Sequence, residues 1–151
     1  MTKVNNSSHL TFNYPLMALD FWQSPSHFNA VCDPLLQHLS LSNSLASTHV
    51  TPALTALAAA SLSSAEQLKV INSGILKLMR ADSAAVRLAA VKCQRSLTDR
   101  LGEEWVALLP EMLPFIAELL EDDDEGVERE TRAWIRGVEE LVGESLEGML
   151  Q

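Results

Sequence analysis

The sequence predicts an all-α fold, an α-α superhelix of about three antiparallel helix pairs. One observation is an apolar stripe at helical spacing within residues 75–102. Another is an internal repeat with a period near 40 residues. A third is that a hairpin of this kind cannot bury its own apolar stripe. Together they predict helix pairs that stack on their neighbours.

The stripe lies on the second helix of a hairpin that turns at Asp82. Its members follow one another at spacings of four, three, four and four residues: Val86, Ala90, Cys93, Leu97 and Leu101. These spacings keep all five side chains on one face of a helix. Cys93 is therefore expected to be a small buried apolar residue rather than a reactive thiol.

The repeat is seen when the sequence is shifted by 41 residues. The shift places Ile75, Leu78, Asp82, Val86, Leu101 and Gly102 on Ile116, Leu119, Asp123, Val127, Val142 and Gly143. A helix-pair period of this length is typical of HEAT or armadillo repeats, so the expected architecture is a HEAT-repeat solenoid. Leu39 and Asn43 align with the same positions at an offset of 39, which gives three repeats over about 27–62, 64–102 and 103–143.

The first pair is expected to begin with a helix over residues 27–40. Pro34 lies inside it and is expected to kink the helix or to mark its true start. The second helix is rich in alanine and runs to about residue 62, and its regular part is expected to begin near Thr51 because Pro52 suits a first turn. The inward residues are expected to be Val31, Leu35, Leu36 and Leu39, then Val50, Leu54, Leu57 and Ala58.

The second pair has clear helix ends. Ser63 or Ser64 is expected to cap its first helix, Asp82 to cap the second, and Gly102 to end it. The first of these helices is expected to turn one stripe inward: Leu68, Ile71, Ile75, Leu78 and Met79.

The third pair contains two prolines in its first helix, residues 105–121. Pro110 and Pro114 predict that this helix is kinked or divided. The last long helix is expected over about 124–142, with an inward face of Val127, Trp134, Ile135, Val138 and Leu141. Its outer face carries three oppositely charged pairs at i,i+4: Glu125–Arg129, Glu128–Arg132 and Arg136–Glu140.

Charge is divided unevenly along the chain, whose net charge is −9. Residues 1–65 sum to −1, residues 66–100 to +4, and residues 101–151 to −12. This asymmetry suggests different partners at the two ends of an elongated molecule. The acidic total argues against the whole chain binding nucleic acid, because phosphate binding depends on Lys and Arg.

The basic segment, residues 69–100, supplies the candidate partner-binding residues Arg87, Lys92, Arg95 and Arg100. On a helix, Lys92 and Arg95 point away from the apolar stripe, whereas Arg87 lies at its edge, where an Asp of a neighbouring turn can pair with it. One interpretation is a solvated face with an internal Arg–Asp ladder between repeats. The other is a docking surface for an acidic protein or an RNA backbone.

Catalysis, cofactors and metals find no support in the sequence. The four histidines never pair at i,i+4, and no phosphate-binding loop, dinucleotide fingerprint or nucleophile elbow is found. The acidic run 121–126 does not complete a calcium loop, because Arg132 stands where the loop needs a glutamate. Because the sequence has no signal peptide and no apolar run long enough to span a membrane, we expect a soluble intracellular protein with no membrane partner. We also expect that it is not an enzyme and that it has no cofactor and no small-molecule substrate.

Three segments carry a resemblance to a known family: LTDRLGEEW (97–105), LPEMLPFIAELLEDDDEGVE (109–128) and VGESLEGML (142–150). Together, over about residues 20–151, they resemble the C-terminal end of the large HEAT-repeat family of the small-subunit processome, the U-three small nucleolar RNA-associated proteins of type ten. A generic HEAT repeat does not demand these segments.

The resemblance implies a non-catalytic scaffold of the nucleolus, within the nucleus. It implies roles in small-subunit rRNA processing, in ribosome biogenesis and in rDNA transcription by RNA polymerase I. The implied partners are other processome proteins, with pre-rRNA or small nucleolar RNA reached indirectly. The alternative is a direct RNA-contacting module that uses residues 69–100.

The two ends of the chain are expected to differ. Residues 1–19 are rich in Asn, Ser and Thr and are expected to form a poorly structured leader before a HEAT-repeat domain over 20–151. Residues 144–151 are expected to cover the open apolar face of the last repeat with Leu146, Met149 and Leu150. The C-terminus is therefore expected to be a true end and the N-terminus an interrupted one.

Overall fold

The computed structural model describes residues 25–41 and 46–151, and every regular element within these ranges is helical. The expected leader and Asn43 lie outside them. The elements are α2 (Pro25–Ser40), the π-helix η1 (Ala46–Val50), α3 (Thr51–Ala60), α4 (Ala65–Leu78), α5 (Ala84–Leu101), α6 (Glu103–Val106), α7 (Leu109–Leu119), α8 (Glu125–Val142) and the 3-10 helix η2 (Glu147–Met149). The all-α prediction is confirmed.

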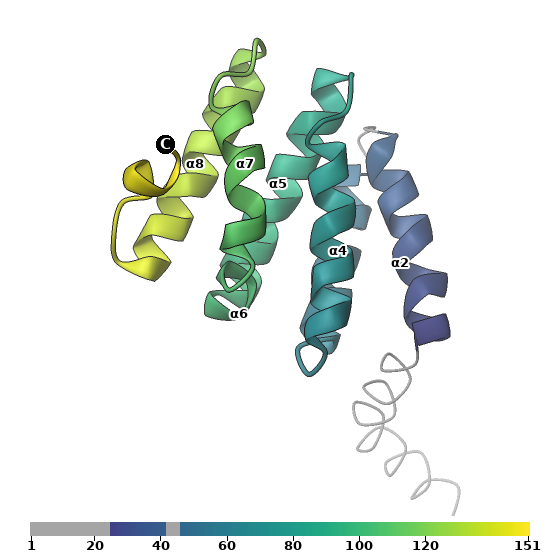
Figure 1. Cartoon of the computed structure of the whole chain (residues 1–151). Coiled ribbons are helices and arrows are strands. Elements are labelled where there is room, and N and C mark those ends of the chain that lie inside the picture. Colours follow the sequence, from purple (N-terminus) through teal and green to yellow (C-terminus); the bar gives the residue numbers. More distant parts are fainter. Residues whose placement is uncertain (1–24, 42–45) are drawn as a thin grey trace, which may run out of the picture.

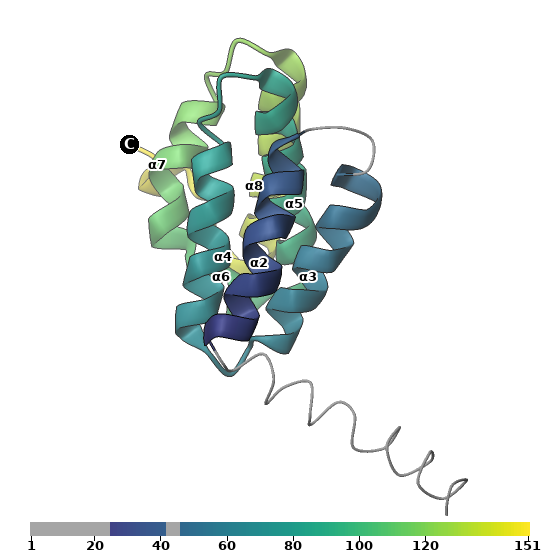
Figure 2. The same ribbon diagram turned by 90° about the vertical axis from the view of Figure 1, so that its right-hand side faces the viewer.

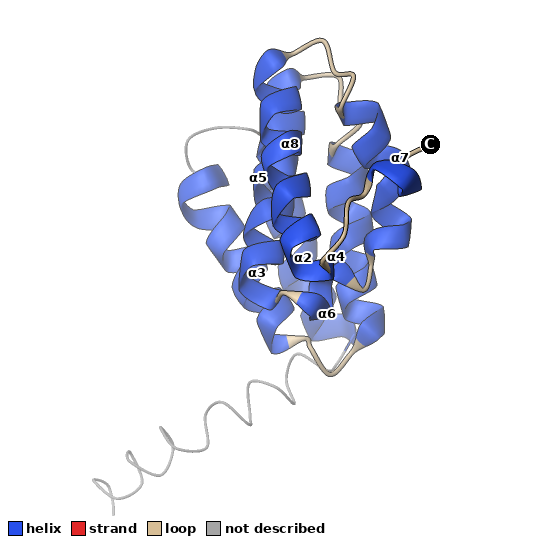
Figure 3. Cartoon of the chain, turned by 90° about the vertical axis from the view of Figure 1, so that its left-hand side faces the viewer, coloured by secondary structure: helices blue, strands red, loops and turns tan. Residues whose placement is uncertain are grey.

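The helices form three antiparallel pairs in two layers. Figure 1 shows α2, α4 and α7 side by side in front, with α5 and α8 behind them. Turned by 90°, the chain shows α4 and α7 on one side and α3, α5 and α8 on the other (Figures 2 and 3). We call the layer of α3, α5 and α8 the B layer; α5 lies at its centre and packs on both of its neighbours.

The helix starts follow the predicted capping chemistry, with one correction. The Ser64 hydroxyl accepts a hydrogen bond from the Gln67 backbone N–H, and an Asp124 carboxylate oxygen accepts one from that of Val127. Both bonds satisfy amides that have no partner within the helix. Asp82 was expected to cap α5, but Ser83 occupies the N-cap position with extended backbone, and Asp82 is exposed one residue earlier.

A glycine with positive φ ends each of the two B-layer helices α5 and α8. Gly102 follows α5 at φ +59°, and Gly143 follows α8 at φ +78°, in the left-handed region. A side chain is strained at such angles, so glycine suits both positions. These are the two glycines that the 41-residue shift superposes.

As predicted, the first helix of the third pair is divided and Pro52 lies at a helix start, but Pro34 does not mark the start of its helix. α6 ends at Val106 and α7 begins at Leu109, so the expected helix over 105–121 is two helices. Pro52 lies in the first turn of α3, which begins at Thr51. Pro34 lies within α2, which starts earlier than expected, at Pro25.

The core runs the length of the stack and contains most of the predicted inward residues. Leu97, Trp105, Trp134 and Cys93 are completely buried. Leu78 was expected to be buried like Leu39 and Leu119, but it is only partly so, and Met79 takes the fully buried place beside it. Leu141 and Met149 were also expected to turn inward and are instead 39% and 42% exposed.

Polar side chains form a hydrogen-bonded chain inside this core. The Asn72 side-chain oxygen accepts a hydrogen bond from Gln94 Nε2 at 2.9 Å, and Gln94 Oε1 accepts one from Trp105 Nε1 at 2.8 Å. One turn further along α5, the Thr98 hydroxyl accepts a hydrogen bond from Trp134 Nε1 at 2.8 Å. These bonds link α4, α5, α6 and α8, and the helical pattern of the sequence did not predict them.

Candidate functional site: the charged B-layer groove

Three of the four arginines in the basic segment join the second helix pair to the third. Each binds a carboxylate 35 or 38 residues later in the chain: Arg80 to Glu118 at 2.6 Å, Arg87 to Asp122 at 2.8 Å and Arg95 to Glu130 at 2.7 Å. Arg80 lies in the turn after α4 and pairs with α7, Arg87 lies in the first turns of α5 and pairs with the turn after α7, and Arg95 joins α5 to α8. Much of the positive charge of residues 66–100 is therefore used within the molecule.

Arg87 is the most enclosed of the three. Its guanidinium forms two hydrogen bonds with the Asp122 carboxylate and two with the Ala81 and Asp82 carbonyls, and the Arg87 side chain is 18% exposed. The hydrogen bond to Asp122 raises the pKa of Arg87 above its ordinary value, against the effect of partial burial. Asp122, rather than the aligned Asp123, completes the predicted contact between Arg87 of α5 and an Asp of the neighbouring turn.

The Asp122 carboxyl experiences opposing effects. Burial acts to raise its pKa, but hydrogen bonds from Arg87 and from the Asp124 backbone N–H outweigh burial and lower the pKa below its ordinary value. The side chain is 7% exposed. The ionised carboxylate is thus the form that this turn stabilises.

Arg80 lies on the other layer of the stack and contacts two residues of α7. Its guanidinium donates two hydrogen bonds to Glu118 and lies 3.9 Å from the centroid of the Phe115 ring. Both charged side chains are about half exposed, so solvent screens this pair and its contribution to stability is small.

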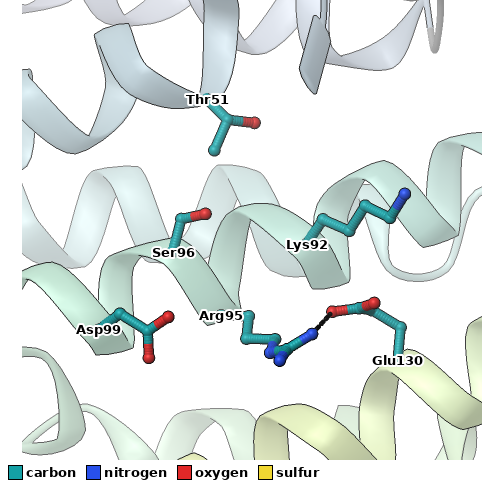
Figure 4. A pocket seen from close by; sticks show the side chains of 6 residues that line it. All are labelled: Thr51, Lys92, Arg95, Ser96, Asp99 and Glu130. Atoms are coloured by element: carbon teal, nitrogen blue, oxygen red, sulfur yellow. Dashed lines mark hydrogen bonds and ion pairs between the residues drawn. The ribbon is translucent and has the colours of Figure 1, made fainter. Parts of the chain in front are cut away.

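Lys92 and Arg95 lie together in a groove on the B layer. The groove encloses about 300 Å³ and is lined by Thr51 of α3, by Lys92, Arg95, Ser96 and Asp99 of α5, and by Glu130 of α8. Figure 4 shows the Arg95 guanidinium directed at the Glu130 carboxylate, with Lys92 and Asp99 on the two sides of this pair. Cations and carboxylates therefore alternate along the groove.

A second hollow continues the groove between α5 and α8. It encloses about 220 Å³ and shares Arg95 and Asp99 with the first hollow. On α8 it adds Arg136 and Glu140 beside Gly137, where a Cβ would meet no neighbouring atom within 4 Å. We call the two hollows together the B-layer groove. Its mixed charges suit a polar protein surface better than a run of phosphates.

The structure brings together two of the four candidate residues. Lys92 and Arg95 line the B-layer groove, Arg87 is occupied at the turns, and Arg100 is exposed near the end of α5, outside the residues that line the groove. Within residues 25–41 and 46–151, no ion pair is formed by Lys92 or Arg100.

Sequence reasoning missed the acidic half of the groove, Asp99 and Glu130. A signal for Glu130 exists: Arg87 and Asp122, like Arg95 and Glu130, are separated by 35 residues, so the same offset joins opposite charges on stacked helices twice. For the three predicted i,i+4 pairs of α8, the outcome is mixed. Of these, Glu128–Arg132 is formed in the structure and the other two are not.

Other chemistry is limited in the part of the chain that the structure describes. There, no group of three His, Cys, Asp or Glu side chains is arranged to hold a metal ion, and no helix is long and apolar enough to cross a membrane. Cys32 and Cys93 are buried and free. Burial raises the pKa of Cys93 to about 12 and, with the nearby Asp33, that of Cys32 to about 11, so both thiols stay protonated.

The fold and the groove define an all-α protein of stacked helix pairs with a charged groove across one layer. No protein-family model matches the chain. Curated relatives named U3 small nucleolar RNA-associated protein 10 do match it over 87% of its length: the chain is 59% identical to the protein of Phaeosphaeria nodorum, 54% to that of Neurospora crassa and 47% to that of Coccidioides immitis. The family resemblance drawn from the sequence is thereby confirmed.

The chain covers a small part of these relatives. The matched segments span 132 to 144 residues, which is 7–8% of the length of each relative. The homology therefore concerns one segment of a far longer protein.

Proposed function

We propose that the chain is a non-catalytic HEAT-repeat scaffold that docks other proteins within the small-subunit processome. Its implied setting is the nucleolus, in small-subunit rRNA processing and ribosome biogenesis. The homology to U3 small nucleolar RNA-associated protein 10 supports the assembly, and the three stacked helix pairs support the scaffold role.

One observation favours protein over RNA as the direct partner. Arg80, Arg87 and Arg95 each bind a carboxylate of the third helix pair. An RNA backbone would have to displace Glu130 from Arg95 and would then meet Asp99 in the same groove. Like charges facing a phosphate oppose binding, whereas a protein surface can match both signs.

Lys92 is the residue that we expect to contact the partner. It is exposed and lines the groove, and its charge is not taken up by an ion pair within the described residues. Arg95 is expected to orient Glu130 and to keep the groove open between α5 and α8.

A paired charge reversal tests the proposal. Lys92→Glu alters the groove, and Lys69→Glu makes the same change at an exposed position of α4 that does not line the groove. The chain and both variants are used to recover processome proteins from nuclear extract treated with ribonuclease. Protein docking predicts that Lys92→Glu loses these proteins while Lys69→Glu keeps them.

The RNA alternative makes a different prediction. A single-stranded RNA oligonucleotide held by Z phosphate contacts should lose affinity with salt at a log–log slope of about −0.7Z, and both variants should weaken it similarly. Tight RNA binding with such a slope, together with loss of the proteins after ribonuclease, would contradict direct protein docking.

A further inference from the structure

The third helix pair carries a pocket of different character from the B-layer groove. It lies between the end of α7, α8 and the C-terminal segment, which Figure 1 places beside α8. It encloses about 340 Å³ and has more apolar than polar lining. We call it the C-terminal pocket. Its apolar residues are Leu120, Ile135 and Leu150.

Two arginines one turn apart on α8, Arg132 and Arg136, line the pocket beside this apolar surface. They are two of only three basic residues in residues 101–151, a segment of net charge −12, and the third is Arg129. Positive charge in this acidic segment is thus concentrated on α8.

The two arginines differ in whether they form an ion pair within the chain. Arg132 donates a hydrogen bond to Glu128 at 2.7 Å. The predicted pair between Arg136 and Glu140 is not formed, and Arg136 is exposed with no ion pair in the described part of the chain. An exposed guanidinium beside an apolar pocket is well placed to bind a carboxylate in a bidentate manner.

The acidic residues of the pocket are positioned differently. The Glu139 carboxylate accepts a hydrogen bond from the Leu146 backbone N–H at 2.9 Å and so helps to hold the C-terminal segment against α8. Glu147 lies in η2 of that segment rather than on α8. A bound carboxylate is therefore favoured on the α8 side, at Arg136, and an apolar side chain in the space between.

We propose that the C-terminal pocket binds a short segment of another protein in which an acidic side chain lies close to a Leu- or Phe-like side chain. The apolar side chain packs on Leu120, Ile135 and Leu150, and the carboxylate pairs with Arg136. The C-terminal pocket shares Arg136 with the B-layer groove. The two proposals are nevertheless tested by different variants and readouts: Lys92→Glu leaves the residues of the pocket unchanged, and Arg136→Glu is read by peptide binding rather than by recovery of processome proteins, so either proposal can fail without the other.

The test is selection from a random peptide library displayed on phage, with the full chain as bait. Selection on the chain is coupled to counter-selection on its Arg136→Glu variant. Arg129→Glu is the matched control, because it reverses the same charge on an exposed residue of α8 that does not line the pocket. The most enriched peptide is then synthesised and titrated against the isotopically labelled chain by NMR.

The expected result is an enriched motif that joins Asp or Glu to Leu or Phe. The synthetic peptide should shift amide signals around residues 120, 132–139 and 145–150, and Arg136→Glu should weaken it about tenfold or more, while Arg129→Glu changes its affinity less than about twofold. No enrichment, a basic motif, equal weakening by both variants, or a dimer of the chain that Arg136→Glu dissociates would each overturn the proposal.

Discussion

Trp105 donates its indole N–H to the side-chain oxygen of Gln94 across 2.8 Å, and both residues are completely buried. The amide of Gln94 at the same time donates to Asn72, so one side chain satisfies polar groups on two other helices. A buried polar group without a partner costs much more than one exposed to water. Gln94 therefore connects α4, α5 and α6 as well as filling space.

Replacing Gln94 tests this connection. Gln94→Leu keeps the approximate volume but leaves the Trp105 N–H and the Asn72 oxygen without their partner. We expect the free energy of unfolding to fall by about 2–5 kcal/mol, since each unsatisfied buried group costs about 1–3 kcal/mol. Urea denaturation followed by tryptophan fluorescence measures this loss. Gln37→Leu, the same change at an exposed position of α2, should cost less than about 0.5 kcal/mol, and an equal loss in the two variants would contradict the role of the hydrogen bonds.

Leu97 tests the shared core at the middle of the stack. Its side chain is completely buried on α5. Leu97→Ala should lower the free energy of unfolding by about 2–5 kcal/mol, as core leucine truncations do. Leu62→Ala removes the same atoms where 44% of the residue is exposed, and it should cost clearly less. A loss below about 1 kcal/mol for Leu97→Ala would show that the core does not depend on this stripe.

Much of the fold was predictable because the spacing of apolar residues marks the buried helix faces and because glycine and proline mark the helix ends. Helical spacing placed Val86, Ala90, Cys93 and Leu97 on one buried face, and Gly102 marked the helix end. The errors are local. The helical pattern assigned both Leu78 and Met79 to the core, but only Met79 is fully buried. It also assigned Leu141 to the core, although the last turn of α8 leaves this residue exposed.

The candidate site was harder to predict because it depends on contacts between helix pairs. Lys92 and Arg95 could be placed on an outward face from periodicity alone. Whether Arg95 faces solvent or Glu130 depends on the register of α5 against α8. The spacing of residues within one helix does not determine that register. The hydrogen bond between Gln94 and Trp105 depends likewise on the sharp turn at Gly102.

Acid should weaken the contact between Arg87 and Asp122. The pKa of Asp122 lies below its ordinary value of 3.8, so the carboxylate's contribution to stability is present above that value and is lost as the pH falls through it towards the folded-state pKa. Asp122→Asn should cost about 1–3 kcal/mol at neutral pH. The difference between the chain and this variant should shrink in urea unfolding at about pH 3.

Asp123→Asn is the control for this titration. Asp123 is the adjacent residue, is exposed and forms no ion pair among the described residues, so the same change should leave unfolding nearly unaltered at neutral pH. A difference between the chain and Asp122→Asn that stayed constant from neutral to acid pH would mean that ionisation of Asp122 does not stabilise the turn.

Leu146 provides the last prediction, which concerns the C-terminal segment. Its side chain is completely buried, its backbone N–H donates to Glu139, and η2 follows it directly. Leu146→Ala should therefore cost about 2–5 kcal/mol in urea unfolding, and deletion of residues 144–151 at least as much. Met149→Ala, at an exposed position of the same segment, should cost less than about 0.5 kcal/mol.

Hydrogen exchange gives a second measurement of the same segment. The Leu146 amide should be protected in the chain, because it donates to Glu139. Free exchange at this amide, together with no loss of stability on deletion of residues 144–151, would show that the segment does not cover the last helix pair.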